Sequence, residues 1–491
     1  MPALLDLPVE ILHAIVLELN GSDRKPLRST CNGLSTVVEP FLFSEITINT
    51  HRSVLKTVSI PFCKALAQFP SEDGVVKDER TLSTYVRTLR VQDKPSTTGH
   101  DNASQEALDE WQEVFTSALS SLVNLGTFRW EMSENIPSWM YAQVPEIVSK
   151  LPMLSEFFLA GEFLVGAIDP PSIRLDYLRN LRTLAIDGIR LPKATFSQTI
   201  LGPLSTALLN IPDLQTLHIR AHISFSDVFR AILDTKGASV LNIKKLVVQN
   251  LTMDVPATMI PHLQCLSSLE VCASQNTEVG NFWNVLQTAS VSLEVLKVYG
   301  DIDRTLLDYI SHCHSRLKVL HLSGAVRKAT DEMSNELADL FFGSVLHKFA
   351  KSLRELRIRP SYKGRWCLGP HNAVDMFSRC SNLETLSVCF NGKEGIVDMI
   401  DDIMNRAHSL PKLKSLDLGT AAATWGRGAR RGTGRIEYLL EMRRAIRNAL
   451  KNLQPTEAQV GSGLWIYTSM YYYRACRMQD GSLQYEEFRL R

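Results

Sequence analysis

Cysteine and histidine are the side chains in this sequence whose types could hold a metal or attack a substrate. The nine cysteines are irregularly spaced, and none forms a Cys-x-x-Cys pair. His312, Cys313 and His314 stand together, but a zinc site needs about four ligands and no second pair accompanies them. Most cysteines fall in apolar runs, where a free thiol packs as a small hydrophobic group. We therefore expect buried thiols in a reducing compartment, with no metal and no cofactor.

A basic, glycine-rich segment runs from Trp425 to Arg435. Arginine and glycine segments can bind RNA or phosphate through charge and stacking, but a single short copy is more often a solvated loop. Its glycines lack the spacing of a phosphate-binding loop, and no Lys-Ser or Lys-Thr pair closes it. The spacing excludes a nucleotide-binding loop. We interpret the segment as a solvated loop, and binding of nucleic acid is the weaker alternative.

The sequence carries no nucleophile elbow, no His-Glu-x-x-His helix, no kinase motif set and no paired-carboxylate motif. Isolated histidines and aspartates on a repeat array are usually surface or core residues. We expect a protein that is not an enzyme.

Length and composition restrict the fold class. At 491 residues the chain exceeds a single hydrophobic core, so it must be several domains or a repeat array. The net charge of +1 gives no sign of a nucleic-acid coat. No apolar stretch approaches the ~20 residues that span a bilayer, and Asp6, Glu10 and Glu18 stand where a secretion signal would be basic. We expect a soluble chain in the cytoplasm, the nucleus or both, without a membrane partner.

The first 48 residues predict three short helices. Asp6 and Pro8 suit a helix start, and Asn20-Gly21 suits its end. A buried stripe is predicted by the apolar residues Ile11, Leu12, Ile15, Val16 and Leu19. Ser22 or Asp23 is expected to cap a second helix, and a third is expected from Ser35. Three such helices bury little surface, which implies a partner.

The segment from Leu7 to Phe43 resembles the F-box, most clearly in its opening, Leu7-Pro8-x-Glu10-Ile11. The resemblance implies docking on the Skp-type adaptor of a Skp, cullin and F-box ubiquitin ligase. The implied adaptor contacts are Leu7, Pro8, Ile11, Ile15, Leu27, Cys31 and Leu34. Pro26 and Gly33 depart from the family pattern, and a second helix starting at Asp23 would place Pro26 in its first turn. The alternative is a helical hairpin that only caps the repeats.

A pattern of the form L-x-x-L-x-L recurs along most of the chain. Strong copies start 23 to 36 residues apart, which is the length of one strand, one return helix and two turns. The alternating apolar residues predict short strands stacked in a curved parallel sheet, with helices on the other side. The ten strong copies begin at Leu154, Leu181, Leu214, Ile243, Leu266, Leu293, Leu317, Leu353, Leu383 and Leu413, and weaker copies begin at Val86 and Leu125. The irregular period resembles the loose leucine-rich repeats of fungal F-box proteins.

These patterns predict an α/β chain with four parts. Residues 1–48 form the F-box, and 49–110 form a linker with weak repeats and mobile loops at 71–80 and 92–105. Residues 111–420 form the leucine-rich-repeat solenoid, which we expect to be continuous from 150 to 420. Residues 421–491 form the basic loop, a helix and a cap with two strands, at 464–473 and 482–490.

The third, fifth and seventh positions of each repeat are expected to face outward on the strands. In the middle of the array these positions are mostly basic or aromatic, which predicts a site for an acidic or phosphorylated segment. The predicted substrate contacts are Lys297, Tyr299, His321, Arg357 and Arg359. Acidic residues such as Glu270, Glu355 and Asp417 stand at equivalent positions, so a mixed, solvated face is the alternative.

The resemblance and the repeats together predict a non-catalytic receptor that joins an adaptor, and through it a cullin, to an unknown protein substrate. A leucine-rich-repeat scaffold that acts without ubiquitination is the alternative, and an RNA-associated repeat protein is a further one.

Overall fold

The computed structural model describes residues 4, 7–67, 82–94, 104–133, 136–161, 172–188, 192–234, 239–273, 279, 281–312, 316–324, 331–361, 363–390, 395–421, 433–468 and 471–489. The predicted loop at 71–80, most of the loop at 92–105, and the segment 425–432 lie outside these residues, as do Cys313 and His314. The chain divides into two compact units, Met1–Ile243 and Lys244–Arg491.

The first unit opens with three helices, α1 (Val9–Glu18), α2 (Gly21–Arg28) and α3 (Asn32–Leu42). The expected caps at Ser22 or Asp23 are wrong, because the side-chain oxygen of Asn20 accepts the backbone N–H groups of Ser22 and Asp23 at 2.9 and 3.1 Å. Helix α2 therefore begins at Gly21, and Pro26 lies near its end instead of in its first turn.

Two further contacts tie the three helices together. Arg24 Nε donates to the carbonyl oxygen of Val16 at 3.0 Å, which satisfies a carbonyl at the end of α1. Arg28 forms an ion pair with Glu39 of α3 at 3.0 Å. The helices therefore form a defined module in spite of their short lengths.

Six parallel strands follow in the first unit, each paired with the next strand along the chain. They are β1 (Glu45–Asn49), β2 (Thr88–Gln92), β3 (Thr127–Met132), β4 (Glu156–Gly161), β5 (Thr183–Asp187) and β6 (Thr216–Arg220). Strand β1 was not predicted and begins inside the segment assigned to the F-box. Its two buried residues, Ile46 and Ile48, are too short a pattern to match the repeat.

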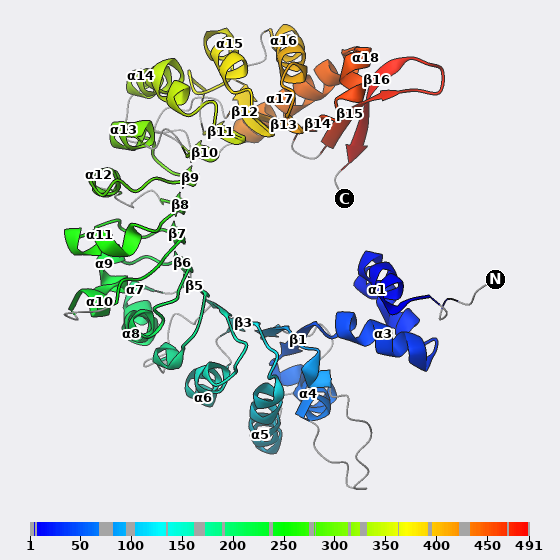
Figure 1. The fold of residues 1–491 in the computed structure, drawn as a ribbon, viewed down its shortest axis with the longest axis vertical. Helices are drawn as coiled ribbons and strands as arrows, with labels where there is room; N and C mark the ends of the chain where they lie inside the picture. The colour runs from blue at the N-terminus through cyan, green and yellow to red at the C-terminus, as the bar shows by residue number, and fades with distance from the viewer. Residues whose placement is uncertain are drawn as a thin grey trace. The chain divides into compact units, whose positions relative to one another are not determined.

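Helices separate these strands along the chain. They are α4 (Ile60–Ala67), α5 (Gln105–Ser121), α6 (Ser138–Ser149), α7 (Lys193–Phe196), α8 (Gly202–Asn210), α9 (Phe225–Val228) and α10 (Arg230–Asp234). Figure 1 shows α5, α6 and α8 on the same side of the strands.

The second unit begins with eight parallel strands. They are β7 (Lys245–Gln249), β8 (Ser268–Cys272), β9 (Val295–Tyr299), β10 (Val319–Gly324), β11 (Glu355–Pro360), β12 (Thr385–Phe390), β13 (Ser415–Thr420) and β14 (Trp465–Thr468). The first and second apolar strand positions are buried throughout, as in Leu296 and Val298 of β9.

The helices of the second unit lie on one side of its parallel strands, as α12, α13 and α16 show in Figure 1. They are α11 (Ile260–Leu263), α12 (Phe282–Thr288), α13 (Arg304–His312), α14 (Asp331–Leu340), α15 (Pro370–Arg379), α16 (Ile396–His408), α17 (Thr433–Asn452) and α18 (Glu457–Gly461). Alternating strands and return helices in parallel order are an α/β leucine-rich-repeat architecture. The predicted repeats are confirmed within each unit.

The C-terminal cap has three strands where the sequence predicted two. The expected strand at 464–473 is divided between β14 and β15 (Tyr471–Arg477), and β16 (Leu483–Arg489) follows. Strands β14, β15 and β16 are antiparallel neighbours. Tyr472 stacks on Phe488 at 5.1 Å between ring centroids and Tyr473 is fully buried, so these aromatic residues pack within the cap.

Candidate functional site

The N-terminal module has a closed interior. Leu12 and Val16 of α1 pack with Val37 and Val38 of α3, and all four are buried. The half-buried residues that pack against them are Leu7, Leu27, Phe41 and Leu42.

One side of α1 presents aliphatic groups that this interior does not use. Pro8, Ile11 and Ile15 stand three and four residues apart, which places them along one helix face. Ile11 is 48% exposed and Ile15 is 39% exposed. Leu17, which is 60% exposed, lies away from this face because of its position in the helical turn. We call Pro8, Ile11 and Ile15 the α1 stripe.

The other predicted adaptor contacts lie deeper. Leu7 and Leu27 are half-buried against the interior, and Cys31 is a half-buried residue at the start of α3. Leu34 is only 7% exposed. The structure therefore leaves Pro8, Ile11 and Ile15 on the surface, while Leu34 supports the fold of the module.

The five predicted substrate contacts lie on three adjacent strands of the second unit. His321 of β10 pairs in register with Lys297 of β9 and Arg357 of β11. Tyr299 and Arg359 both pair with Ser323, so they form a second row two residues further along. The structure brings together residues that are up to 62 positions apart in the sequence. We call Lys297, Tyr299, His321, Arg357 and Arg359 the strand-face patch.

Carboxylates neutralise the cations of this patch. Lys297 Nζ lies 3.9 Å from Glu270, and Arg357 Nε donates to Glu355 at 2.6 Å. Arg359 forms an ion pair with Asp417 and also donates to the hydroxyl of Ser387 at 3.0 Å. Each of the three permanent cations therefore has its own carboxylate, which agrees with the alternative of a mixed face. Substrate binding by the strand-face patch stays a prediction.

His321 adds no positive charge to the patch at neutral pH. Its side chain is 7% exposed, and its Nε2 lies 2.8 Å from Glu355. Burial lowers the pKa of His321 in spite of the opposing hydrogen bond to Glu355. Burial also raises the pKa of the Tyr299 hydroxyl.

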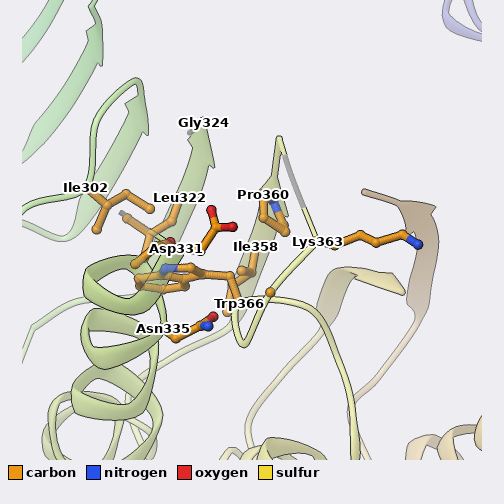
Figure 2. A pocket seen from close by; sticks show the side chains of 11 residues that line it. Ile302, Leu322, Gly324, Asp331, Asn335, Ile358, Pro360, Lys363 and Trp366 are labelled. Atoms are coloured by element: carbon orange, nitrogen blue, oxygen red, sulfur yellow. The ribbon is translucent and has the colours of Figure 1, made fainter. Parts of the chain in front are cut away.

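A small cavity lies near the carboxyl ends of β10 and β11, and Figure 2 shows its lining. Leu322 and Ile358 form part of its wall, and Asp331 and Trp366 contribute polar groups. Within the described part of the chain, the buried indole N–H of Trp366 meets no acceptor. The cavity has about 40 Å³ of space for water, which suits a few solvent molecules better than the side chain of a partner.

Four of the cysteines in the described part of the chain are buried. Burial raises the pKa of the Cys63, Cys380 and Cys389 thiols to about 12 and that of Cys367 to about 11. Such thiols are poor nucleophiles. Cys265, by contrast, is exposed. No group of three or more potential metal ligands occurs among the residues that the structure describes.

No helix within the described ranges has the length and apolar character to cross a bilayer.

Comparisons with known proteins give fold likenesses only. No family model matches the chain, and no curated protein matches it in sequence. A chain from the crystal structure of the TLR13–ssRNA13 complex is 15% identical with a TM-score of 0.33, and the match covers 70% of this chain and 47% of that one. A chain from the crystal structure of the Rad7 and Elc1 complex in yeast is 15% identical with a TM-score of 0.38, covering 87% and 93%. This chain thus spans about half the length of the TLR13 chain. The strand and helix order described above is that of a leucine-rich-repeat fold.

Proposed function

We propose that this chain is the substrate-recognition subunit of an SCF-type ubiquitin ligase. Its N-terminal module binds a Skp-type adaptor, and through it a cullin, while its repeats bind a target protein. The chain itself has no catalytic role in this proposal, and it acts in the cytoplasm, the nucleus or both.

The α1 stripe is the observation that carries the proposal. The interior of the three-helix module is filled without Ile11 and Ile15. Both side chains remain exposed on the same face of α1. Exposed aliphatic groups gathered on one face of a small domain are typical of a protein-binding surface. The sequence resemblance to the F-box assigns the same face to the adaptor.

The repeats supply the second half of the proposed activity. Parallel stacking places polar side chains from successive strands a few ångströms apart, which builds a broad surface for a protein partner. Holding a target near transfer machinery raises its effective concentration there, so recruitment alone accounts for the activity.

The adaptor surface can be tested with two isoleucines and a matched leucine. Ile11→Asp with Ile15→Asp should weaken capture of a purified Skp-type adaptor by about 100-fold or more, because each buried aliphatic side chain contributes ~1.5–3 kcal/mol. Leu17→Asp makes the same chemical change at an exposed site on another face of α1 and should change capture less than about threefold. Affinity measured by titration calorimetry distinguishes the variants.

Wild-type capture by the double aspartate variant would contradict the adaptor assignment. Adaptor capture without cullin-dependent ubiquitination of any bound protein would instead support the scaffold alternative. The comparison of Ile11 and Ile15 with Leu17 avoids Leu7 and Leu27, because those two also pack against the interior and their substitution would damage the module itself.

A further inference from the structure

A second cationic region lies at the amino ends of strands β10 to β13. It is a hollow of about 640 Å³ to which five basic residues contribute. These are Arg316, Lys318, Lys351, Arg354 and Lys412. We call it the amino-end hollow.

The repeat explains why these residues meet. Lys318 and Arg354 directly precede β10 and β11, and Arg354 N donates to the carbonyl oxygen of Lys318 at 2.8 Å. Glu384 N donates to the carbonyl oxygen of Arg354 at 2.7 Å, so the backbone ladder continues to the next repeat. Adjacent parallel strands lie ~4.8 Å apart, which brings residues separated by about 30 positions into one hollow.

Two of the five cations have carboxylate partners. Lys318 lies 2.7 Å from Glu294, and Arg354 lies 3.9 Å from Glu384. A hydrogen bond from Lys318, assisted by the charge of Arg316, holds the pKa of Glu294 below its usual range, so this carboxylate stays ionised at neutral pH.

The other three cations lack an ion pair of their own among the described residues. In the described part of the chain, no carboxylate forms an ion pair with Arg316, Lys351 or Lys412. Lys412 Nζ donates to the amide oxygen of Asn382 at 2.8 Å, a contact that orients the ammonium without neutralising it. Five cations against Glu294 and Glu384 give the lining a net charge of +3.

We propose that the amino-end hollow binds an acidic segment of the target protein, an inference that rests on the proposed role of the repeats as the target-binding part. Carboxylates of such a segment would pair with Lys351 and Lys412 and draw Arg316 inward. The described residues lining the hollow include no aromatic ring. Proteins that bind single-stranded nucleic acid usually combine a basic groove with aromatic side chains on which the bases stack, so a basic lining without such rings favours an acidic protein segment.

The test uses the full-length chain and a fluorescent peptide of ten glutamates flanked by glycines. The wild-type chain should bind it more tightly than a matched glutamine peptide, and binding should weaken as salt rises. Lys351→Glu with Lys412→Glu should weaken binding at least tenfold in fluorescence anisotropy. Lys351→Gln with Lys412→Gln should give a smaller loss in the same direction, so the result does not depend on one pair of substitutions.

One control pair accompanies these variants. Arg443→Glu with Arg444→Glu changes two exposed arginines on α17 outside the lining and should leave binding within about twofold. A separate pair, Arg357→Glu with Arg359→Glu, compares the hollow with the strand-face patch. It should weaken binding less than the hollow variants, because both arginines are already paired, and a larger loss would assign the peptide to the patch and overturn the proposal.

Three further outcomes would overturn the proposal. They are equal affinity for the glutamate and glutamine peptides, unchanged binding by both hollow variants, and tighter binding of a single-stranded oligonucleotide that displaces the peptide. All hollow variants should retain wild-type adaptor capture. Loss of adaptor capture by the α1-stripe variants tests the proposed function separately, so failure of one idea is distinguishable from failure of the other.

Discussion

The strand-face patch and the amino-end hollow lie on the same repeats but differ in how their charges are balanced. In the patch, Lys297, Arg357 and Arg359 each have a carboxylate partner. In the hollow, Lys351 and Lys412 have no carboxylate partner within the described residues. Both regions are therefore rich in basic residues, but among the described residues of the two regions only the hollow has lysines and arginines without an ion pair.

This difference indicates what each region does. A cation already bonded to a carboxylate must give up that contact before it binds a partner. The loss of that contact offsets most of the favourable free energy of binding. An exposed, unpaired lysine has no such contact to lose. We infer that the patch mainly stabilises the packing of neighbouring strands, whereas the hollow is available to a ligand.

Removing one carboxylate from each region should give the larger effect in the patch. Glu355→Ala removes the partner of both buried His321 and Arg357, and it should lower the free energy of unfolding by roughly 1–3 kcal/mol. Glu294→Ala breaks the exposed pair with Lys318 and should cost less than about 1 kcal/mol. Urea unfolding followed by circular dichroism measures both.

The same two variants should rank in the opposite order for peptide binding. Glu294→Ala adds one positive charge to the net charge of the hollow and should tighten binding of the glutamate peptide by about two- to threefold. For stability, a loss from Glu355→Ala that is no larger than the loss from Glu294→Ala would contradict the structural role that we assign to the pairing in the patch.

Acidification should give a smaller effect, to which the patch contributes through His321. Burial holds the pKa of His321 below 6.5, so the folded state binds a proton less readily than the unfolded state. The stability that this histidine contributes is fully present above pH 6.5 and is lost as the pH falls toward its lowered pKa. Glu355, Arg357 and Lys297 surround it, and the net effect of these groups and burial is the lowered pKa.

His321→Gln should therefore flatten the loss of stability between pH 7 and 5.5 relative to the wild type. Comparing the variant with the wild type removes the contribution of other histidines, including the half-buried His408, whose pKa burial lowers to about 4. A steeper pH dependence in the variant than in the wild type would contradict the assignment.

The repeats were predictable because the same spacing of apolar residues recurs in each copy. Leu320 and Leu356 stand at the same position of two copies, and both are buried as expected. Strand β1 was missed because Ile46 and Ile48 form too short a pattern, and the boundary between β14 and β15 was missed because the tyrosine run suited a continuous strand. Asn20 was not predicted as the N-cap of α2, because Ser22 and Asp23 have equally suitable side chains.

The candidate sites were harder to predict because they depend on register. The sequence placed Glu355 and Arg357 on the strand face, but only the structure shows that the Glu355 carboxylate contacts both His321 and Arg357. The hollow had a signal that was overlooked, since Lys318 and Arg354 each follow the first leucine of their repeat. Attention to the strand-facing positions alone excluded these residues.

A bridging assay tests most directly whether this chain joins an adaptor to an acidic target. Beads carrying a purified Skp-type adaptor should retain the labelled glutamate peptide only when the full-length chain is present. Retention should be lost with Ile11→Asp and Ile15→Asp, and also with Lys351→Glu and Lys412→Glu, but kept with Leu17→Asp. Retention that survives either double variant, or peptide that competes with the adaptor for the chain, would contradict the account.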